Sequence, residues 1–160
     1  RVRLAPLLDG GGQERGLRGG TLNVPAIVGM GAAFEIAGAE GKAEAQRLRR
    51  LRDRFEAALH EHLPDVRING AGARRLPQTS NITFPGTRAA PLMLALRDLA
   101  VSTGSACSSG SGRPSHVLKA MGLDDADALA TIRFSLGRFT TEEEIEHAIR
   151  HTARAVAASR

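Results

Sequence analysis

The single cysteine of this chain lies in a segment of small residues. Cys107 stands within VSTGSACSSGSGRPS, residues 101–115, where serine and glycine predominate. A free cysteine is most often a small buried apolar residue. A Ser/Gly-rich segment, however, behaves as a flexible coil, and this one offers the thiol no apolar partner on its C-terminal side. The surroundings therefore favour a chemical role for Cys107 over a packing role. They supply no base or fixed cation to form the thiolate, so we expect activation to come from outside the segment.

A glycine-rich segment near the N-terminus has the composition of an anion site. It reads GGGQERGLRGGT over residues 10–21 and runs into an Ala-rich stretch from Pro25. Glycines let backbone N–H groups close around an oxyanion, while Arg18 adds charge, Thr21 adds a hydroxyl and a helix N-terminus follows. The segment lacks the lysine of a Walker A loop and does not match G-x-G-x-x-G after a strand. A phosphate site and a plain flexible loop both stay open.

Arg133 lies between two apolar residues in TIRFS, residues 131–135. In a strand its side chain points away from the face that carries Ile132 and Phe134. It is then either an outward-facing solvated arginine or a fork that grips a carboxylate through two N–H bonds. The spacing does not decide between these interpretations.

The five histidines do not combine into metal-ligand spacing with the one cysteine. His147 and His151 are four residues apart on a predicted helix, but no Glu-x-x-His pattern accompanies them. We expect no metal site here and surface positions for both side chains.

A long helical region must position the glycine-rich segment. Asn23 is a suitable N-cap, and Pro25 fits the first helical turn because its missing N–H would be unpaired there. Apolar residues then recur at helical spacing until Pro64. Gly38 and Gly41 are expected to bend or interrupt this helix.

The rest of the chain alternates between strands and helices. Strands are predicted at 66–70, 79–84 and 131–135, a short extended piece at 100–102, and helices at 90–99 and 115–121. Thr141 and Glu144 form a capping box for a C-terminal helix. The pattern predicts an α/β fold without internal repeats.

Composition excludes several classes of protein. The 160 residues suit one ordinary domain, and no apolar run is long enough to span a membrane. The net charge of +5 draws on five arginines at 47–54, but few aromatics accompany them, so we expect a solvated helix face and no direct nucleic-acid binding. A single cysteine permits no internal disulfide, which fits the cytoplasm. The first residue is not Met, and the N-terminus looks like a cut end.

Several of these segments, in this order, resemble one known family. They are GGGQERGLRGGT (10–21), SNITF (80–84), STGSACSS (102–109) and IRFSLGRFTTEEEI (132–145). Together they resemble the C-terminal part of the cysteine desulfurases, the NifS/IscS-like enzymes of the class V aminotransferase family, which use pyridoxal 5'-phosphate. The long cysteine segment is similar to that of the IscS/NifS group. The family's usual R-S-G-T reads R-G-G-T here.

The resemblance implies a role for three residues. Cys107 would attack the sulfur of L-cysteine, keep it as a persulfide and release L-alanine. Arg133 would hold the substrate carboxylate. Thr21 would bind the cofactor phosphate of the neighbouring subunit in a homodimer, while the role of Arg18 stays open. The sulfur would pass to an iron–sulfur scaffold or another acceptor protein, for cluster assembly or tRNA thiolation.

The resemblance also implies a domain organisation. Residues 1–24 would end the large domain of a fold-type I enzyme, 25–64 would form the connecting helical region, and 65–160 the small α/β domain with the cysteine. The chain's two lysines, Lys42 and Lys119, do not lie in the family's lysine context. The Schiff-base lysine that the cofactor needs would precede the segment. We therefore expect the isolated chain to be inactive.

Two other classes of function stay open. One is a thiol peroxidase or a Cys-dependent hydrolase that pairs Cys107 with His116, although such enzymes place the cysteine at a helix start or beside a fixed base. The other is a noncatalytic sulfur-carrier or binding domain.

Overall fold

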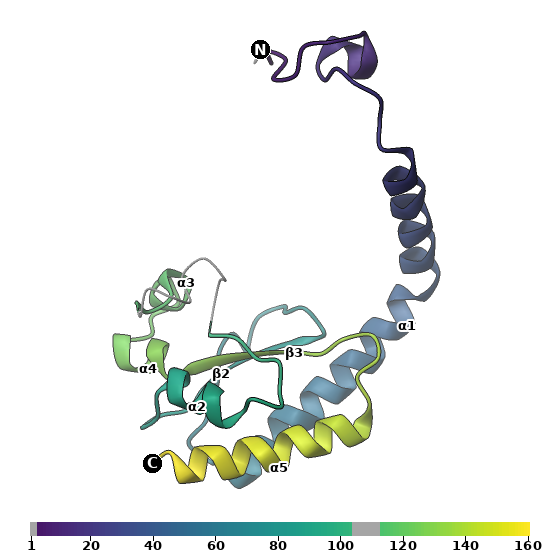
Figure 1. The fold of residues 1–160 in the computed structure, drawn as a ribbon. Helices are drawn as coiled ribbons and strands as arrows, with labels where there is room; N and C mark the ends of the chain where they lie inside the picture. The colour runs from purple at the N-terminus through teal and green to yellow at the C-terminus, as the bar shows by residue number, and fades with distance from the viewer. Residues whose placement is uncertain (1–2, 104–112) are drawn as a thin grey trace. The chain divides into compact units, whose positions relative to one another are not determined.

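The structure, a computed structural model, describes residues 3–103 and 113–160. Its elements in chain order are η1 (Gln13–Gly16), α1 (Val24–His62), β1 (Arg67–Ile68), β2 (Thr79–Thr83), α2 (Ala89–Ala95), α3 (His116–Ala120), α4 (Asp125–Leu129), β3 (Thr131–Ser135) and α5 (Glu142–Ala158) (Figure 1). The chain divides into two compact units, Arg1–Gly41 and Lys42–Arg160. No helix in the described part has the length and apolar character needed to cross a membrane.

Two glycines close the loop of the first unit. The Gly19 N–H donates to the Leu8 carbonyl at 2.9 Å, and a Cβ atom added at Gly19 would lie 2.7 Å from Gly10 Cα. Any larger residue at Gly19 would push the two backbone segments apart. The described side chains of this unit build no core: Leu7 is 96% exposed and Phe34 73%.

Helix α1 is continuous through Gly38 and Gly41. Its N-cap is confirmed, because Asn23 Oδ1 accepts from the Ala26 N–H at 3.2 Å. Of the two expectations for Gly38 and Gly41, a bend or an interruption, the interruption is wrong, since a single helix runs from Val24 to His62. Each glycine costs a helix only about 1 kcal/mol relative to alanine. The surrounding alanines and long side chains are strong enough helix formers to carry the helix across.

The second unit is built on an antiparallel sheet of order β1-β2-β3. Ile82 on β2 faces Ile132 on β3, and both side chains are fully buried. The neighbouring pair, Asn81 and Arg133, is also in register. Because side chains alternate along a strand, that pair must lie on the opposite face of the sheet from the isoleucines.

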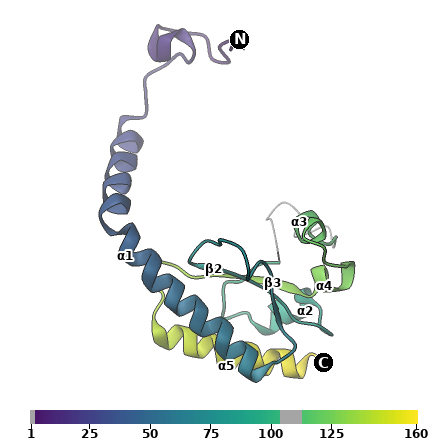
Figure 2. The ribbon, with the colours of Figure 1, turned by 180° about the vertical axis from the view of Figure 1, so that it is seen from behind.

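Helices α1 and α5 lie on the same side of the sheet in both views (Figures 1 and 2). Between them and the sheet, the Phe55 and Phe134 rings are tilted against each other with centroids 4.9 Å apart. Leu59 and Val156 are fully buried in the same cluster. Burial of such side chains contributes roughly 1.5–3 kcal/mol each, so this cluster holds the sheet to the two helices.

Three of the five helical arginines bind the rest of the unit; the expected plain solvated face is wrong for Arg47 and Arg52, whereas Arg54 is exposed as expected. Arg47 donates to the carbonyls of Arg138 at 2.6 Å and Thr140 at 2.7 Å. Arg52 is buried and donates to the Leu76 carbonyl at 2.9 Å, whereas Arg54 pairs with Glu142 at 3.2 Å. Their partners lie far away in sequence, which is why a local charge pattern could not reveal them.

The shorter elements differ from the expectations mainly at their ends. Strand β3 has the predicted bounds, whereas β1 is shorter than predicted and α2 ends at Ala95 instead of residue 99. Helix α4 was not predicted, although Asp124 caps it by accepting from the Asp127 N–H at 2.8 Å. A helix of this length carries too few residues to show a hydrophobic period.

The capping box at the start of α5 is confirmed. Thr141 accepts from the Glu144 N–H at 3.2 Å, and the Glu144 carboxylate accepts from the Thr141 N–H at 2.9 Å. We expect Thr141→Ala to lower the free energy of unfolding by about 1 kcal/mol, because it leaves a helix-end donor without a partner. Chemical denaturation would measure the change. Thr141→Ser keeps the acceptor and should retain most of the stability; an equal loss in both variants would contradict the capping role.

Candidate functional site

Arg133 projects from the sheet on the side away from the core. It is exposed, while Ile132 and Phe134 on either side of it are buried. This agrees with the predicted outward direction. Within the described part of the chain, the Arg133 side chain makes no hydrogen bond or ion pair. No residue of the described part of the chain therefore uses the N–H donors of its guanidinium.

Ser102 is joined to Arg133 through the backbone. The Ser102 N–H donates to the Arg133 carbonyl at 3.1 Å, and the Arg133 N–H donates to the Ser102 carbonyl at 2.6 Å. The chain that leads towards Cys107 is thus attached to the free edge of β3, at the residue expected to bind a carboxylate. Cys107 itself lies outside the described residues. Sequence reasoning predicted an extended piece at 100–102 but not its partner, because the pairing joins segments about thirty residues apart in the chain.

Arg18 has a structural role that its sequence position left open. Its Nη1 donates to the carbonyls of Gly20 at 3.0 Å and Thr21 at 3.2 Å. Gly20 has a φ of +93°, which a glycine adopts without strain. The arginine thereby holds the turn just before α1 and brings a positive charge to the backbone of Thr21.

The residues of this turn suit a phosphate group. Thr21 is exposed and carries a hydroxyl, and Arg18 supplies a cation within the same turn. The first N–H groups of α1 are already used, that of Val24 by the Leu22 carbonyl and that of Ala26 by Asn23 Oδ1. A hydroxyl and a guanidinium are donors that phosphate sites commonly use. The donor set therefore fits the predicted role of Thr21.

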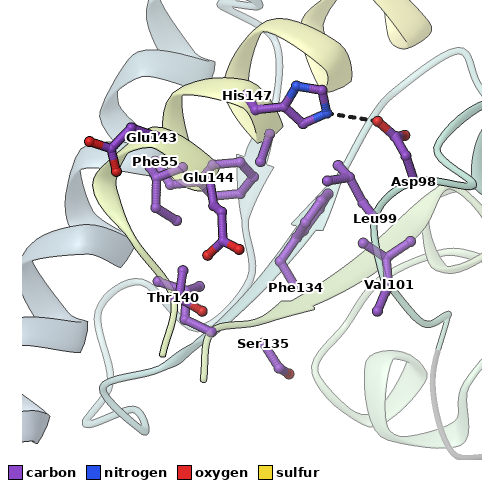
Figure 3. A pocket seen from close by; sticks show the side chains of 14 residues that line it. Phe55, Asp98, Leu99, Val101, Phe134, Ser135, Thr140, Glu143, Glu144 and His147 are labelled. Carbon is purple, nitrogen blue, oxygen red and sulfur yellow. Dashed lines mark hydrogen bonds and ion pairs between the residues drawn. The ribbon is translucent and has the colours of Figure 1, made fainter. Parts of the chain in front are cut away.

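His147 and His151 both contact one carboxylate. Each Nε2 lies 2.7 Å from an Asp98 oxygen, and the two rings stack at an interplanar angle of 14° (Figure 3 shows the Asp98–His147 bond). The hydrogen bond from His147 holds the pKa of Asp98 below its ordinary value. Over residues 3–103 and 113–160, no three side chains of His, Cys, Asp or Glu type are grouped to bind a metal ion.

A cavity of about 500 Å³ lies beside the histidines. Phe134, Leu99 and Val101 line its apolar wall, and Asp98 and His147 stand at its polar side (Figure 3). Arg133 does not line it. The cavity therefore belongs to the core side of β3 and is separate from the outward face that carries the predicted carboxylate-binding residue.

Comparisons with known proteins define the family. Residues 6–147 match the family "Aminotransferase class-V". The chain therefore belongs to the class V aminotransferase family. Structural comparison agrees: a NifS-like protein from Rickettsia africae superposes with a TM-score of 0.83 at 32% identity, covering 98% of this chain and 41% of that one. The predicted α/β fold of the aminotransferase-like type is thereby confirmed.

Within that family, several similar curated proteins are named cysteine desulfurases. A protein named cysteine desulfurase IscS from Anaeromyxobacter sp. (strain Fw109-5) is 52% identical over 150 residues, 94% of this chain and 37% of that protein. Another of the same name, from Stutzerimonas stutzeri, is 49% identical over 156 residues, 98% of this chain and 38% of its own length. These matches confirm the resemblance to the NifS/IscS-like desulfurases. The chain spans little more than a third of the length of these relatives.

Proposed function

We propose that these 160 residues are part of a cysteine desulfurase, which takes sulfur from L-cysteine and releases L-alanine. The observation that carries the proposal is the backbone pairing of Ser102 with Arg133, at 2.6 and 3.1 Å. It attaches the chain leading to Cys107 next to an arginine whose side chain has no described partner. A nucleophile and a carboxylate-binding group belong together in an enzyme that attacks one end of an amino acid while gripping the other. A solved relative, described as SspA in complex with cysteine, has a TM-score of 0.59 at 38% identity and covers 86% of this chain and 37% of its own.

The proposed chemistry gives Cys107 and Arg133 distinct tasks. Arg133 donates two N–H bonds to the substrate carboxylate and fixes the substrate's orientation. The Cys107 thiolate attacks the substrate sulfur, so that a sulfur–sulfur bond forms while the bond between that sulfur and the β-carbon breaks. The electron pair of the broken bond stays with the alanine fragment, which takes up a proton. Cys107 is left as a persulfide that an acceptor can draw on.

Thr21 and Arg18 are proposed to hold the phosphate of pyridoxal 5'-phosphate in a homodimer, in which this turn serves the partner subunit's site. The fit of their donors to a phosphate supports this assignment. When bound, the cofactor withdraws electrons from the α-carbon of the substrate and so makes the alanine fragment a better leaving group. The corresponding domain assignment has residues 1–24 at the end of a large domain, 25–64 as a connecting helix and 65–160 as the small domain.

The isolated 160-residue chain is expected not to react with the cofactor. Lys42 and Lys119 are the only lysines, and Lys119 pairs with Asp125 at 2.5 Å on the short helix α3. Titration with pyridoxal 5'-phosphate should therefore produce no new absorption band from a lysine adduct. A band that disappears in Lys42→Ala or Lys119→Ala would contradict the assignment of the reactive lysine to another part of the enzyme.

The sulfur on Cys107 is proposed to pass to an acceptor protein. Iron–sulfur assembly and tRNA thiolation both take sulfur from a persulfide, through a scaffold or another acceptor protein, and we place this exchange in the cytoplasm. The persulfide is common to both, so the proposal for Cys107 does not depend on the acceptor.

One assay separates the proposed function from its rivals. The complete polypeptide that contains these residues, loaded with cofactor, should release alanine from L-cysteine and leave a persulfide on Cys107. A thiol peroxidase would instead form sulfenic acid with peroxide alone. A noncatalytic carrier would accept sulfur from a donor persulfide but release no alanine from cysteine.

A further inference from the structure

A row of polar side chains crosses the sheet beside Arg133. Arg133 is paired with Ser102 on one side and with Asn81 on the other. Next in the row comes Asn69, whose N–H donates to the Asn81 carbonyl at 2.8 Å. Residues directly opposite one another in antiparallel strands have side chains on the same face. These four side chains therefore share the face of the sheet opposite to the core.

Asn81 and Arg133 form the closer kind of cross-strand pair. The N–H and carbonyl of Arg133 point to Ser102, and the carbonyl of Asn81 points to Asn69, so neither residue directs these groups at the other. In an antiparallel sheet, such a pair without mutual hydrogen bonds brings its side chains nearer than the hydrogen-bonded kind. Their Cβ atoms are then about 4.5–5.5 Å apart. The amide of Asn81 thus stands next to the base of the arginine side chain.

A chain of hydrogen bonds fixes which way the Asn81 amide is turned. It starts at Thr131, whose hydroxyl donates to the Asp127 carbonyl at 2.7 Å, an oxygen that can only accept. Thr83 Oγ1 lies 2.8 Å from Thr131 Oγ1 and must therefore be the donor in that pair. Thr83 is then left to accept, which it does from Asn69 Nδ2 at 2.9 Å.

The same Asn69 nitrogen completes the chain. Its second hydrogen goes to Asn81 Oδ1 at 2.8 Å. Turning either amide over would set two acceptors or two donors against each other, so the network admits one arrangement only. With its oxygen committed to Asn69, Asn81 directs its NH₂ group away from Asn69. In the described part of the chain, that group has no hydrogen-bond acceptor.

We infer that Asn81 is a second binding residue for the carboxylate that Arg133 grips, with Asn69 and Thr83 as its positioning residues. The inference rests on the proposed function, which makes that carboxylate the one of L-cysteine. Asn81 offers two N–H donors and Arg133 five. Their direct register places the two side chains next to each other on one face, so a carboxylate lying along the arginine side chain would reach both sets of donors. A carboxylate accepts up to about four such bonds, so the arginine fork and the amide can be used together. The SNITF segment contributed to the family resemblance but had no functional role assigned to it; the inference gives its Asn81 a role in substrate binding.

The test replaces Asn81 by the isosteric aspartate in the complete, cofactor-loaded enzyme. Asn81→Asp keeps an oxygen for Asn69 but exchanges the NH₂ donors for a charged acceptor. Loss of one charge-assisted hydrogen bond should weaken L-alanine binding about tenfold or more, and raise the KM for L-cysteine similarly. L-Alanine methyl ester lacks the charged carboxylate, so it should bind to Asn81→Asp about as well as it binds to the wild type. An equal change for both ligands, or for neither, would overturn the inference.

Two further variants distinguish binding from structure. Thr83→Val removes the hydroxyl that orients Asn69 while keeping the shape, and should weaken L-alanine binding less than Asn81→Asp does, again without affecting the ester. Thr79→Val, on the same strand and face, is the matched control and should leave both dissociation constants unchanged. If Thr79→Val weakened alanine binding as much as Asn81→Asp, the effect would belong to the sheet face in general and the inference would fail.

Direct calorimetric binding keeps this test independent of turnover. A wild-type enzyme that binds L-alanine but releases none from L-cysteine would contradict the proposed function alone. An active enzyme whose Asn81→Asp variant binds L-alanine normally would contradict the role of Asn81 alone. Should Asn81→Asp unfold, Asn81→Ser carries the same expectation, with a weaker effect because charge repulsion is absent.

Discussion

Cys107→Ser is expected to eliminate alanine release from L-cysteine in the complete enzyme. A serine hydroxyl stays protonated at neutral pH and is a poor nucleophile towards sulfur, whereas a cysteine has an appreciable thiolate fraction. Removing a covalent nucleophile typically lowers the rate by about a thousandfold or more. Steady-state assay of alanine measures the loss, and the dissociation constant for L-alanine should hardly change because the thiol does not bind the carboxylate.

Ser108→Ala provides the matched control for this prediction. It alters the adjacent residue of the same segment and leaves the thiol in place, so activity should stay within about twofold, as is usual for substitutions away from the reacting atoms. Substantial turnover by Cys107→Ser would contradict the assignment of Cys107 as the nucleophile. It would mean that another residue of the enzyme accepts the sulfur.

Arg133→Leu is expected to raise the KM for L-cysteine about a hundredfold, the effect of losing two hydrogen bonds to a charged group. The fold should be unaffected, since the side chain is exposed and has no partner in the described part of the chain. The pairing with Ser102 uses only backbone atoms and survives the change. Arg133→Lys keeps the charge but not the planar fork and should recover only part of the affinity.

Arg49→Leu is the control for this second prediction. Arg49 is another exposed arginine of the same unit, on α1, and its loss removes the same charge without touching the sheet face. Its KM should match that of the wild type. A rise of similar size in Arg49→Leu would mean that net charge, not the position of Arg133, attracts the substrate.

Local signals in the sequence predicted the elements that local interactions hold in place. The capping box of Thr141 and Glu144 spans three residues and is formed as expected. Strand β3 alternates buried and exposed residues around Arg133, so its bounds and its outward arginine could be predicted together. Asn23 caps α1 for the same reason, because the acceptor and its N–H lie within one turn.

The contacts that build the candidate site could not be predicted in this way. The pairing of Ser102 with Arg133 and the amide contact of Asn69 with Asn81 join residues that are distant in sequence. Their partners depend on strand register, which tertiary packing decides. The SNITF segment and the extended piece before Cys107 could both be predicted from the sequence. Their pairing with Arg133 is seen only in the structure.

Sulfur transfer to the Cys107 thiol can be observed in a single turnover. The complete, cofactor-loaded enzyme is mixed with one equivalent of L-cysteine per site and no acceptor, then digested and analysed by mass spectrometry while alanine is counted. We expect the peptide containing Cys107 to gain one sulfur atom and one alanine to appear for each persulfide. Alanine release with the extra sulfur on another residue, or an unmodified Cys107 with no alanine, would contradict this expectation.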